Sequence, residues 1–467
     1  MTNIIENTKI CMEIEDADIT VDLIQTLIDI HKPIISGRFK ILDDYYKGNQ
    51  EILNRVIDDV TKPNNKPVTN FCSYVSDTLV GFFVGKPVSY TSTDKEFLDV
   101  LSKVFADNDE QTENHDLGHK ASIKGQGFEI VYLDEEGNVN FDCLDTDSIL
   151  MVYDCSIKSI PLMAIRHYDV HNYIDDTTIT KIEVYTRTQI LHYTDDGGIV
   201  FDSSEPHYFG ELPISEYKNN RYNRSDFENI ITLQNIFNKN NADISNDVEY
   251  FSNAYLVLEN MSGTTAEDVA KINENRVILT SENGKAYFLT KQLNDQVVQN
   301  HRNNLSEDIH KIAYVPDLSK EINSNVSGSA LKTKMFTTAD IIVNKERKFK
   351  KALQTRIKLI ATILNLKGYK DIEGKNLVTH PYNYKDIVIN FHRNMPVGTY
   401  ETADDISKMS TVVSQKTLLT EIGVEDVEAE IKQIEKEKDT MVDLDNLHTE
   451  TAPIVEDTPK VVDENAK

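Results

Sequence analysis

In the first quarter of the chain, apolar residues recur every three or four positions, which is the spacing of one face of an α-helix. The pattern begins at Val21 and continues as far as Pro63, where a proline would interrupt a helix. A second predicted helix ends at Gly85, and residues 95–122 return to the helical pattern. We therefore expect a mainly helical N-terminal region.

From Phe128 to about residue 201 the apolar period changes to two, which is typical of β-strands. The stretch "FEIVYLDEEGNVNFDCL" predicts a hairpin that turns at Glu136-Gly137-Asn138. The stretch "GQG" (125–127) is expected to allow a tight turn from helix to strand. Further alternating segments joined by Asp/Gly turns indicate an antiparallel sheet between helical regions, and hence an α+β fold.

Two later helices, predicted over residues 226–251 and 293–316, have narrow apolar stripes. Most of their other positions are polar, so we expect each helix to bury little surface against its own chain. The segment between them, residues 252–292, has the pattern of a strand, a helix and two further strands. The stripe residues of the first helix are Ile230, Leu233, Phe237, Asn240, Ile244, Val248 and Phe251. Those of the second helix are Leu293, Val297, Leu305, Ile309 and Ile312.

A long helix is predicted from about residue 329 to residue 367, without Pro or Gly. Between residues 332 and 358 it carries nine Lys and Arg but only Asp340 and Glu346. These cations could form a solvated face that pairs with acidic neighbours in the same chain. They could also neutralise acidic surfaces of adjacent subunits or approach DNA, and the three interpretations are compatible.

The segment between the second narrow-striped helix and the long helix is mainly polar. Residues 317–328 are rich in Ser and Asn and include Gly328. A simple connector between helices would account for this composition. A polar loop that changes conformation at low cost would account for it equally.

The formal net charge of −28 over 467 residues argues against a conventional high-affinity DNA-binding protein. The chain is long enough for several structural units. The four cysteines form no CxxC pair, so neither a zinc knuckle nor a disulfide framework is indicated, and a reducing cytosol fits. We expect no signal peptide and no membrane span, because no run approaches about 18 apolar residues. Residues 421–467 hold 15 acidic and five basic side chains.

The sequence holds one candidate for metal chemistry. His115 and His119 are four residues apart and would share a helix face, as in some zinc hydrolases. However, Asp116 stands where such enzymes place a Glu, and no third ligand is evident nearby. Two polar residues on an exposed helix face are the simpler interpretation. No phosphate-binding loop is present, and we predict no enzymatic activity and no cofactor.

Five stretches, in this order, resemble portal proteins of tailed double-stranded DNA bacteriophages, in the branch typical of long-tailed phages of Gram-positive bacteria. The resemblance covers roughly residues 25–440. The stretches are "NKPVTNFCSYVSDTLVGFFVGKPVSY" (65–90), "SIKGQGFEIVYLDEEG" (122–137), "LPISEYKNNRYNRSDFENI" (212–230), "SGSALKTKM" (327–335), and "FHRNMPVGTYE" (391–401) with "SQKTLL" (414–419).

The resemblance implies a ring, dodecameric in the capsid, at the single vertex through which DNA enters and leaves. It implies a mainly helical portal fold with an antiparallel β subdomain. Its parts would be a wing (1–225 and 329–392), two stem helices (226–251 and 293–316), a clip (252–292), a tunnel loop (317–328), a crown (393–440) and a disordered acidic tail (441–467).

The resemblance also assigns roles to residues. The tunnel loop would present Ser319, Lys320, Glu321, Asn323, Ser324 and Asn325 to DNA in the channel. The clip would face the terminase through Glu259, Asn260, Glu267 and Asp268. The stem helices would contact neighbouring subunits through Leu233, Phe237, Ile244, Leu305 and Ile309.

The implied partners are further copies of the chain, double-stranded DNA, the terminase large subunit, and scaffold, major capsid and head-completion or adaptor proteins, with no membrane. The implied location is the virion, and the host cytoplasm during assembly. An acidic channel wall would also avoid the firm phosphate contacts that hold DNA in place. A zinc-dependent hydrolase that uses His115 and His119 and a non-conducting virion scaffold or adaptor protein are the alternatives.

Overall fold

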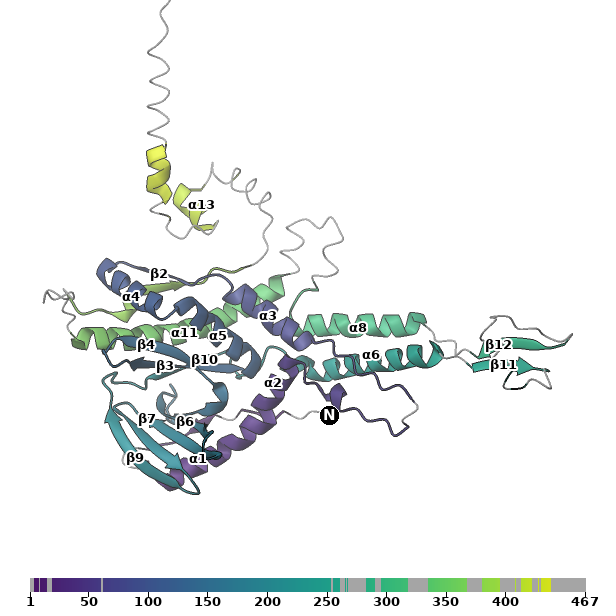
Figure 1. The fold of residues 1–467 in the computed structure, drawn as a ribbon. Helices are drawn as coiled ribbons and strands as arrows, with labels where there is room; N and C mark the ends of the chain where they lie inside the picture. The colour runs from purple at the N-terminus through teal and green to yellow at the C-terminus, as the bar shows by residue number, and fades with distance from the viewer. Residues whose placement is uncertain are drawn as a thin grey trace, which may run out of the picture. The chain divides into compact units, whose positions relative to one another are not determined.

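The computed structural model divides the chain into two units, residues 1–395 and residues 396–467, and its fold class is α+β (Figure 1). This confirms the fold class that the sequence predicts. The structure describes residues 4–7, 9–14, 19–59, 62–252, 255–260, 265, 267, 283–289, 295–317, 335–367, 380–394, 408, 413–421, 427 and 430–437.

The predicted N-terminal helices are present but shorter than expected. Helix α1 (Val21–Ile34) is capped by the Thr20 side chain and continues through a π-helical turn, η2 (Ile35–Phe39), into α2 (Lys40–Lys47). Gly48 ends α2 in the left-handed region at φ 85°. The prediction of a helix as far as Pro63 is therefore wrong, since only a 3₁₀ turn, η3 (Glu51–Asn54), follows.

The other early helices agree with their sequence patterns. Helix α3 (Phe71–Phe83) ends just before Gly85, as predicted. The helical segment 95–122 is two helices, α4 (Lys95–Asp107) and α5 (Glu110–Lys124), because Asp109 adopts φ 47° between them. Gly125 ends α5 at φ 86°, and a Cβ there would lie 2.0 Å from the Asn223 carbonyl oxygen. This confirms the tight turn predicted at "GQG".

A six-stranded sheet has the order β1-β5-β6-β7-β8-β9. Each neighbouring pair is antiparallel except β1 and β5, which are parallel. Side chains on one face of β5, such as Leu150 and Val152, pack in a core with Ile24 and Leu27 of α1. The strands are β1 (Ile10–Cys11), β5 (Ile149–Tyr153), β6 (Pro161–Asn172), β7 (Thr177–Tyr185), β8 (Gln189–Asp195) and β9 (Ile199–Pro206).

A three-stranded antiparallel sheet, in the order β10-β3-β4, packs on the other face of β5. Its strands are β3 (Gln126–Leu133), β4 (Val139–Leu144) and β10 (Ile214–Lys218). Phe128 and Ile214 on one face meet Met151 of the larger sheet. Val131 on the opposite face packs against helices, so the order of layers is α1, large sheet, small sheet, helices.

The long basic helix α11 (Phe336–Lys367) lies in this helical layer with α3, α4 and α5. Its 32 residues correspond to about 48 Å at 1.5 Å per residue. After α11, a 3₁₀ turn, η6 (Tyr384–Asp386), leads into β13 (Ile387–Asn390). This strand pairs antiparallel with β2 (Ser89–Ser92), so it ties the end of this unit to its first third.

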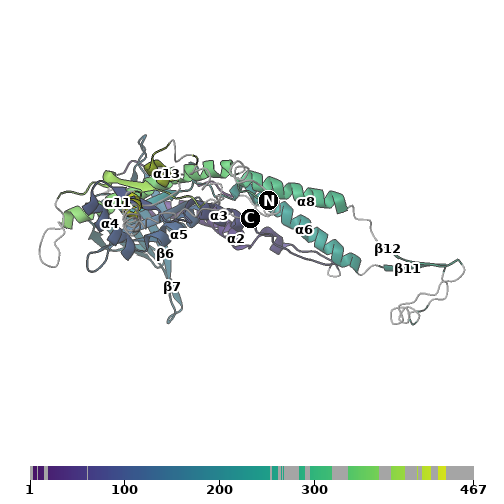
Figure 2. The ribbon, with the colours of Figure 1, turned by 90° about the horizontal axis from the view of Figure 1, so that it is seen from above.

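Helices α6 (Ile231–Ser252) and α8 (Asp295–Ala313) form an antiparallel pair that lies side by side in both views (Figures 1 and 2). A 3₁₀ turn, η5 (Glu228–Ile230), precedes α6. In chain order, β11 (Tyr255–Glu259) and β12 (Lys285–Leu289) lie between the two helices and pair antiparallel. Both helices predicted from the narrow stripes are therefore present.

The second unit contains α13 (Gln415–Glu421) and a helical segment over residues 430–437. Across the ranges that the structure describes, no helix combines the length and the apolar character that crossing a membrane would require.

Candidate functional site

The α6–α8 pair has two parts that differ in their surroundings. We define the root as residues 231–242 of α6 with 305–313 of α8, and the far half as residues 243–252 with 295–304. At the root, Phe237, Leu305 and Ile309 join a core that also holds residues of α2, α3, α5 and η5. The root is thus part of the layered body, and the far half extends beyond it (Figure 1).

This arrangement corrects the expectation that the striped helices bury little against their own chain. Phe237, Leu305 and Ile309 have exposed fractions of 3%, 7% and 0% within a single copy. Leu233 and Ile244 are half-buried. The assignment of these five residues to a subunit interface stays a prediction, but at the root the chain itself covers the stripe.

The far half carries apolar side chains that face solvent in the single chain. Val248, Tyr250 and Val297 are exposed by 57%, 42% and 60%. Here the expectation of a narrow, uncovered stripe describes the structure better. A surface that these side chains share with another molecule would remove apolar area from water.

Two amides at the root were missed by the sequence analysis. Gln234 and Asn238 are fully buried, although polar side chains in a mainly polar helix suggest exposure. Gln234 accepts from the Phe71 backbone N–H at 3.1 Å and donates to the Thr69 carbonyl at 2.6 Å. Asn238 accepts from the Thr69 N–H at 3.0 Å and donates to Gln50 at 2.5 Å. These amides therefore hold the segment before α3, residues 55–70, against α6. We call it the approach segment.

The same approach segment also contacts the far half of α6. The Arg55 guanidinium lies 2.7 Å from the Asp243 carboxylate. The Asn65 backbone N–H donates to Asn246 at 2.7 Å, and its side chain donates to Glu249 at 2.6 Å. The spacing of the amides at 234, 238 and 241 places these three near one face of α6, whereas Asn246 lies off that face, so the sequence spacing signals only the contact at the root.

The two ends of the predicted tunnel loop lie next to the root. Tyr74 of α3 donates to the Pro316 carbonyl at 3.2 Å, and Val315 is buried. On the other side of the loop, Thr338 donates to the Tyr314 carbonyl at 2.5 Å. The described residues on the two sides of the predicted loop therefore lie close together. Ser319, Lys320, Glu321, Asn323, Ser324 and Asn325 lie outside the described residues.

Two of the predicted clip residues, Glu259 and Asn260, lie at the end of β11. Glu259 ends β11 and accepts from the Tyr287 hydroxyl at 2.9 Å, which raises the pKa of Tyr287. Asn260 turns the chain at φ 54°. Glu267 is exposed and helical, and Asp268 lies outside the described residues.

The basic helix α11 pairs part of its charge inside its own chain, as the first interpretation of its cations expected. Lys345 lies 2.5 Å from Asp226, and both side chains are buried. Lys358 pairs with Glu211. Lys348 and Lys351 are exposed and form no ion pair with a carboxylate in the described ranges.

Arg356, also in α11, is fully buried in a cluster with two carboxylates. Its guanidinium donates to Glu129 and lies 3.4 Å from Glu110, and it packs over the Phe141 ring at 4.4 Å. Burial raises the pKa of Glu110, and Arg356 opposes that effect. Removal of the arginine would leave buried carboxylates without a counter-charge, so the cluster is structural.

The two histidines of the alternative metal site stack at 6.1 Å between ring centroids on α5. His119 Nε2 lies 2.9 Å from the Tyr46 hydroxyl and 3.2 Å from Asp77. The same carboxylate and burial raise the pKa of Tyr46 to about 12, burial having the larger effect. Within the described part of the chain, no three His, Cys, Asp or Glu side chains are grouped as metal ligands. The geometry gives this alternative no support.

Known portal proteins are similar to this chain over most of its length. The portal protein of Bacillus phage SPP1 is 25% identical over 466 residues, which cover 93% of this chain and 88% of that protein. The portal protein of Clostridium phage phiCD119 is 23% identical over 426 residues, which cover 85% of this chain and 90% of that protein.

Solved structures similar to this chain come from the necks of gene transfer agent particles. The neck of the native particle, computed with C12 symmetry, aligns with a TM-score of 0.45 at 11% identity over 75% of this chain and 89% of that chain. The neck of the empty particle, computed with C6 symmetry, aligns with a TM-score of 0.45 at 10% identity, over 76% and 90%.

A sequence model of the family described as "Phage portal protein, SPP1 Gp6-like" matches residues 25–443, which include the small sheet, the large sheet except β1, the α6–α8 pair and the basic helix. The chain therefore belongs to the phage portal protein family of the SPP1 Gp6-like type.

Proposed function

We propose that this chain is the subunit of a closed portal ring, dodecameric in the capsid, that conducts DNA at the unique vertex during packaging and ejection. The observation that carries the proposal is the family match over residues 25–443. The chain acts in the virion, and it is incorporated there during assembly in the host cytoplasm. Its role is structural, and ATP hydrolysis is supplied by a separate terminase.

The α6–α8 pair supports a ring because most apolar side chains of its root are buried, whereas most of the described ones in its far half are exposed to solvent. The root is buried in its own chain, whereas Val248 and Val297 of the far half are exposed. In a ring, each far half would lie between those of two neighbours, which would cover this apolar surface. The pair would then be the stem, and the layered body would be the wing.

The remaining parts follow the same proposal. The segment between α6 and α8, with Glu259, Asn260, Glu267 and Asp268, is the clip that faces the terminase large subunit. Residues 393–440 form the crown. The wing and crown contact scaffold and major capsid proteins, and head-completion proteins join the clip after packaging.

Residues 317–328 are proposed as the tunnel loop that contacts DNA in the channel. The hydrogen bonds from Tyr74 to Pro316 and from Thr338 to Tyr314 support this, because they hold the two ends of the loop close together. A loop held in this way can change its conformation without moving the wing. Shortening residues 319–326 should leave rings intact but stop packaging. Normal DNA filling of heads that carry this variant would contradict the role of the loop.

The purified full-length chain provides the main test. Native mass spectrometry should show assemblies whose mass is an integral multiple of 53.2 kDa, and electron microscopy should show a central hole. A single copy under every condition tried would overturn the ring. Closed assemblies without a hole would favour the alternative, a non-conducting scaffold or adaptor protein.

A further inference from the structure

A trough of about 580 Å³ lies at the β10 edge of the small sheet, between α11 and the turns of the large sheet. Lys348 and Lys351 of α11 line one side. Lys158 from the β5–β6 turn and Arg187 from the β7–β8 turn line the other. Lys9, Lys218 and Arg221 complete the cationic lining. We call this surface the basic trough.

The trough has few anions, and they already have partners. Its two carboxylates are Glu211, which pairs with Lys358, and Glu216, which lies 3.0 Å from Lys218 and accepts from Tyr153. The other six cations form no ion pair with any carboxylate that the structure describes. A concentration of positive charge is therefore left over in a chain whose net charge is −28.

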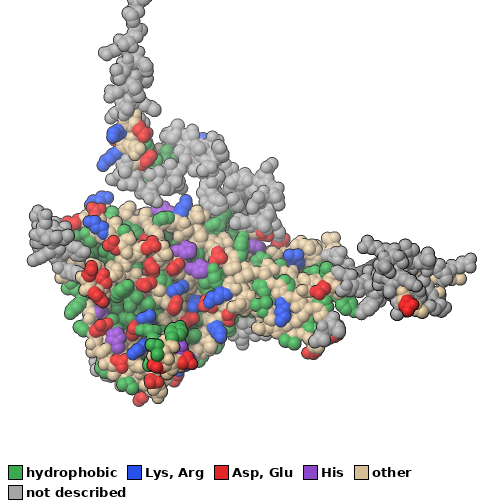
Figure 3. Space-filling model, viewed as in Figure 1, with side chains coloured by type: hydrophobic (Ala, Val, Ile, Leu, Met, Phe, Trp, Pro, Cys, Tyr) green, Lys and Arg blue, Asp and Glu red, His purple; other side chains and the backbone are tan. Residues whose placement is uncertain are grey.

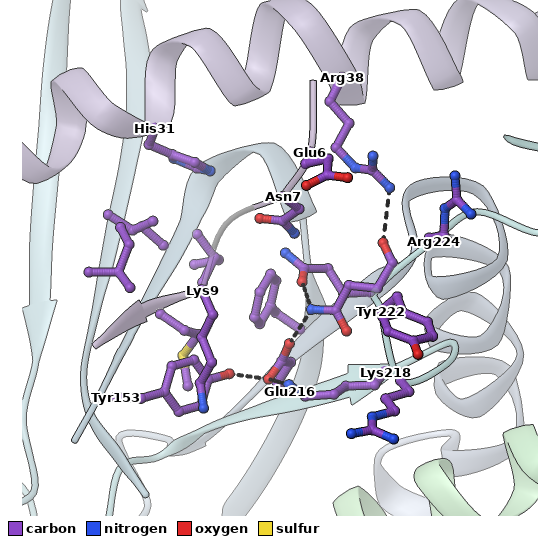
Figure 4. Close-up of a pocket in the computed structure, with 18 of the residues that line it drawn as sticks. Glu6, Asn7, Lys9, His31, Arg38, Tyr153, Glu216, Lys218, Tyr222 and Arg224 are labelled. Carbon is purple, nitrogen blue, oxygen red and sulfur yellow. Dashed lines mark hydrogen bonds and ion pairs between the residues drawn. The ribbon is translucent and has the colours of Figure 1, made fainter. Parts of the chain in front are cut away.

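A second cavity, of about 550 Å³, continues from the trough and shares Lys9, Tyr153, Glu216, Lys218 and Arg221 with it (Figure 4). Figure 4 shows the contact of Tyr153 with Glu216 between the labelled Lys9 and Lys218. The Lys9 ammonium lies 4.3 Å from the centroid of the Tyr153 ring. The N-terminal segment thus adds a cation to a site otherwise formed far along the chain.

The opposite edge of the same small sheet is acidic. Because the strand order is β10-β3-β4, the β4 edge lies across the sheet from the trough. Acidic side chains also gather over the area of α4 and β4 in the view of Figure 3. The residues that we call the acidic edge are Glu113 and Asp116 of α5, Glu135 and Glu136 of the β3–β4 turn, and Asp142 of β4.

Among the described residues, the acidic edge has one ion pair, between Asp116 and His115 at 3.7 Å, and Glu113 accepts from the Cys143 backbone N–H at 2.8 Å. Burial raises the pKa of Glu113, and the nearby carboxylates Asp142 and Asp116 raise it further. The adjacent cation, Lys120, is engaged with Asp145 at 3.1 Å. Like charges held this close would be stabilised by a cation from another molecule.

We propose that the basic trough is a subunit–subunit contact of the wing, and that it receives the acidic edge of the next copy of this chain. The inference rests on the proposed ring, in which each copy presents one flank to the opposite flank of its neighbour. Two surfaces of opposite charge at opposite edges of one sheet meet that geometric requirement. Copies that each carry a net charge of −28 repel one another, so local complementarity would set how they dock.

Two double variants test the contact. Lys348→Glu with Lys351→Glu leaves five cations and four carboxylates in the trough, so most of its net positive charge is lost. Asp116→Lys with Asp142→Lys leaves three carboxylates and two lysines at the acidic edge, so most of its net negative charge is lost. Each variant alone removes most of the attraction between opposite charges at every contact, so the concentration needed for ring assembly should rise by about tenfold or more. Lys40→Glu with Lys86→Glu, at exposed positions outside the trough, is the matched control and should assemble as the wild type does.

The mixture of the two assembly-deficient variants gives the decisive result. In an alternating ring, half of the contacts pair the unchanged basic trough with the unchanged acidic edge. At the other half, the Glu side chains introduced in the trough face the Lys side chains introduced at the edge and can form ion pairs with them. Equimolar mixing should therefore restore even-numbered rings containing both variants, as native mass spectrometry would show. Circular dichroism of each variant checks that it folds.

Three outcomes would overturn the inference. The trough variant could assemble as the wild type does, or the mixture could fail to restore rings from two folded variants. The trough variant could also form normal rings that retain less duplex DNA in a filter assay, which would assign the trough to nucleic acid. If the wild type itself never forms rings, the proposed function fails first, so the two failures are distinguishable.

Discussion

The root and the far half of the α6–α8 pair belong to the same two helices, yet one is stabilised by its own chain and the other is not. At the root, Ile309 is fully buried and Phe237 packs against Phe71 with 5.1 Å between ring centroids. In the far half, Val297 is 60% exposed. A substitution at the root should therefore change folding, and one in the far half should change assembly.

The largest expected effect is at the root. Ile309→Ala removes buried methyl groups from a packed core and should lower the free energy of unfolding by about 2–5 kcal/mol. Ile312→Ala, one helical turn later at a site that is 40% exposed, should cost less than about 1 kcal/mol. Denaturant unfolding of the two variants under dissociating conditions measures the difference. Equal losses would mean that the root is not a true core.

The apolar stripes could be predicted from sequence, but what covers them could not. Apolar residues at every third or fourth position predicted both helices, and apolar residues at every second position predicted the strands. Each pattern follows from the backbone geometry of its element. The periodicity says nothing about which molecule lies against the stripe. For Leu305 and Ile309 the cover comes from α2 and α3, which are more than 200 residues away in sequence.

The burial of polar residues also could not be predicted from the sequence. Gln234 and Asn238 look like solvent-facing positions, and only the folded chain brings the backbone of Thr69 and Phe71 to them. The basic trough could not be predicted from the sequence either. Its cations come from two turns of the large sheet and from α11, which are far apart in the sequence and lie together only in the folded chain. The helix predicted as far as Pro63 failed for a local reason, since Gly48 ends it in a left-handed conformation.

An intermediate effect is expected at the buried amides. Asn238→Ala leaves the Thr69 N–H and the Gln234 amide without their acceptor, which should cost about 1–3 kcal/mol of unfolding free energy. Asn304→Ala, at an exposed position of α8, should be nearly neutral because alanine favours a helix. Hydrogen exchange should show faster exchange at Thr69 in the first variant only. Unchanged protection there would contradict the role of the amide.

The smallest effect on folding, and the sharpest test of the comparison, is expected at Val297. Val297→Asp places a charge on a side chain that is already exposed in the single chain, so the free energy of unfolding should change by less than about 0.5 kcal/mol. In a ring whose far halves pack together, the same carboxylate would be buried without a partner, and assembly should weaken. Gln296→Asp adds the same charge one residue earlier, on a different side of α8, and is the matched control. Sedimentation velocity should show fewer rings for Val297→Asp than for Gln296→Asp at equal concentration. If the two variants assemble alike, the far half does not contact a neighbouring copy through Val297, and the distinction between root and far half reduces to a difference in solvent exposure.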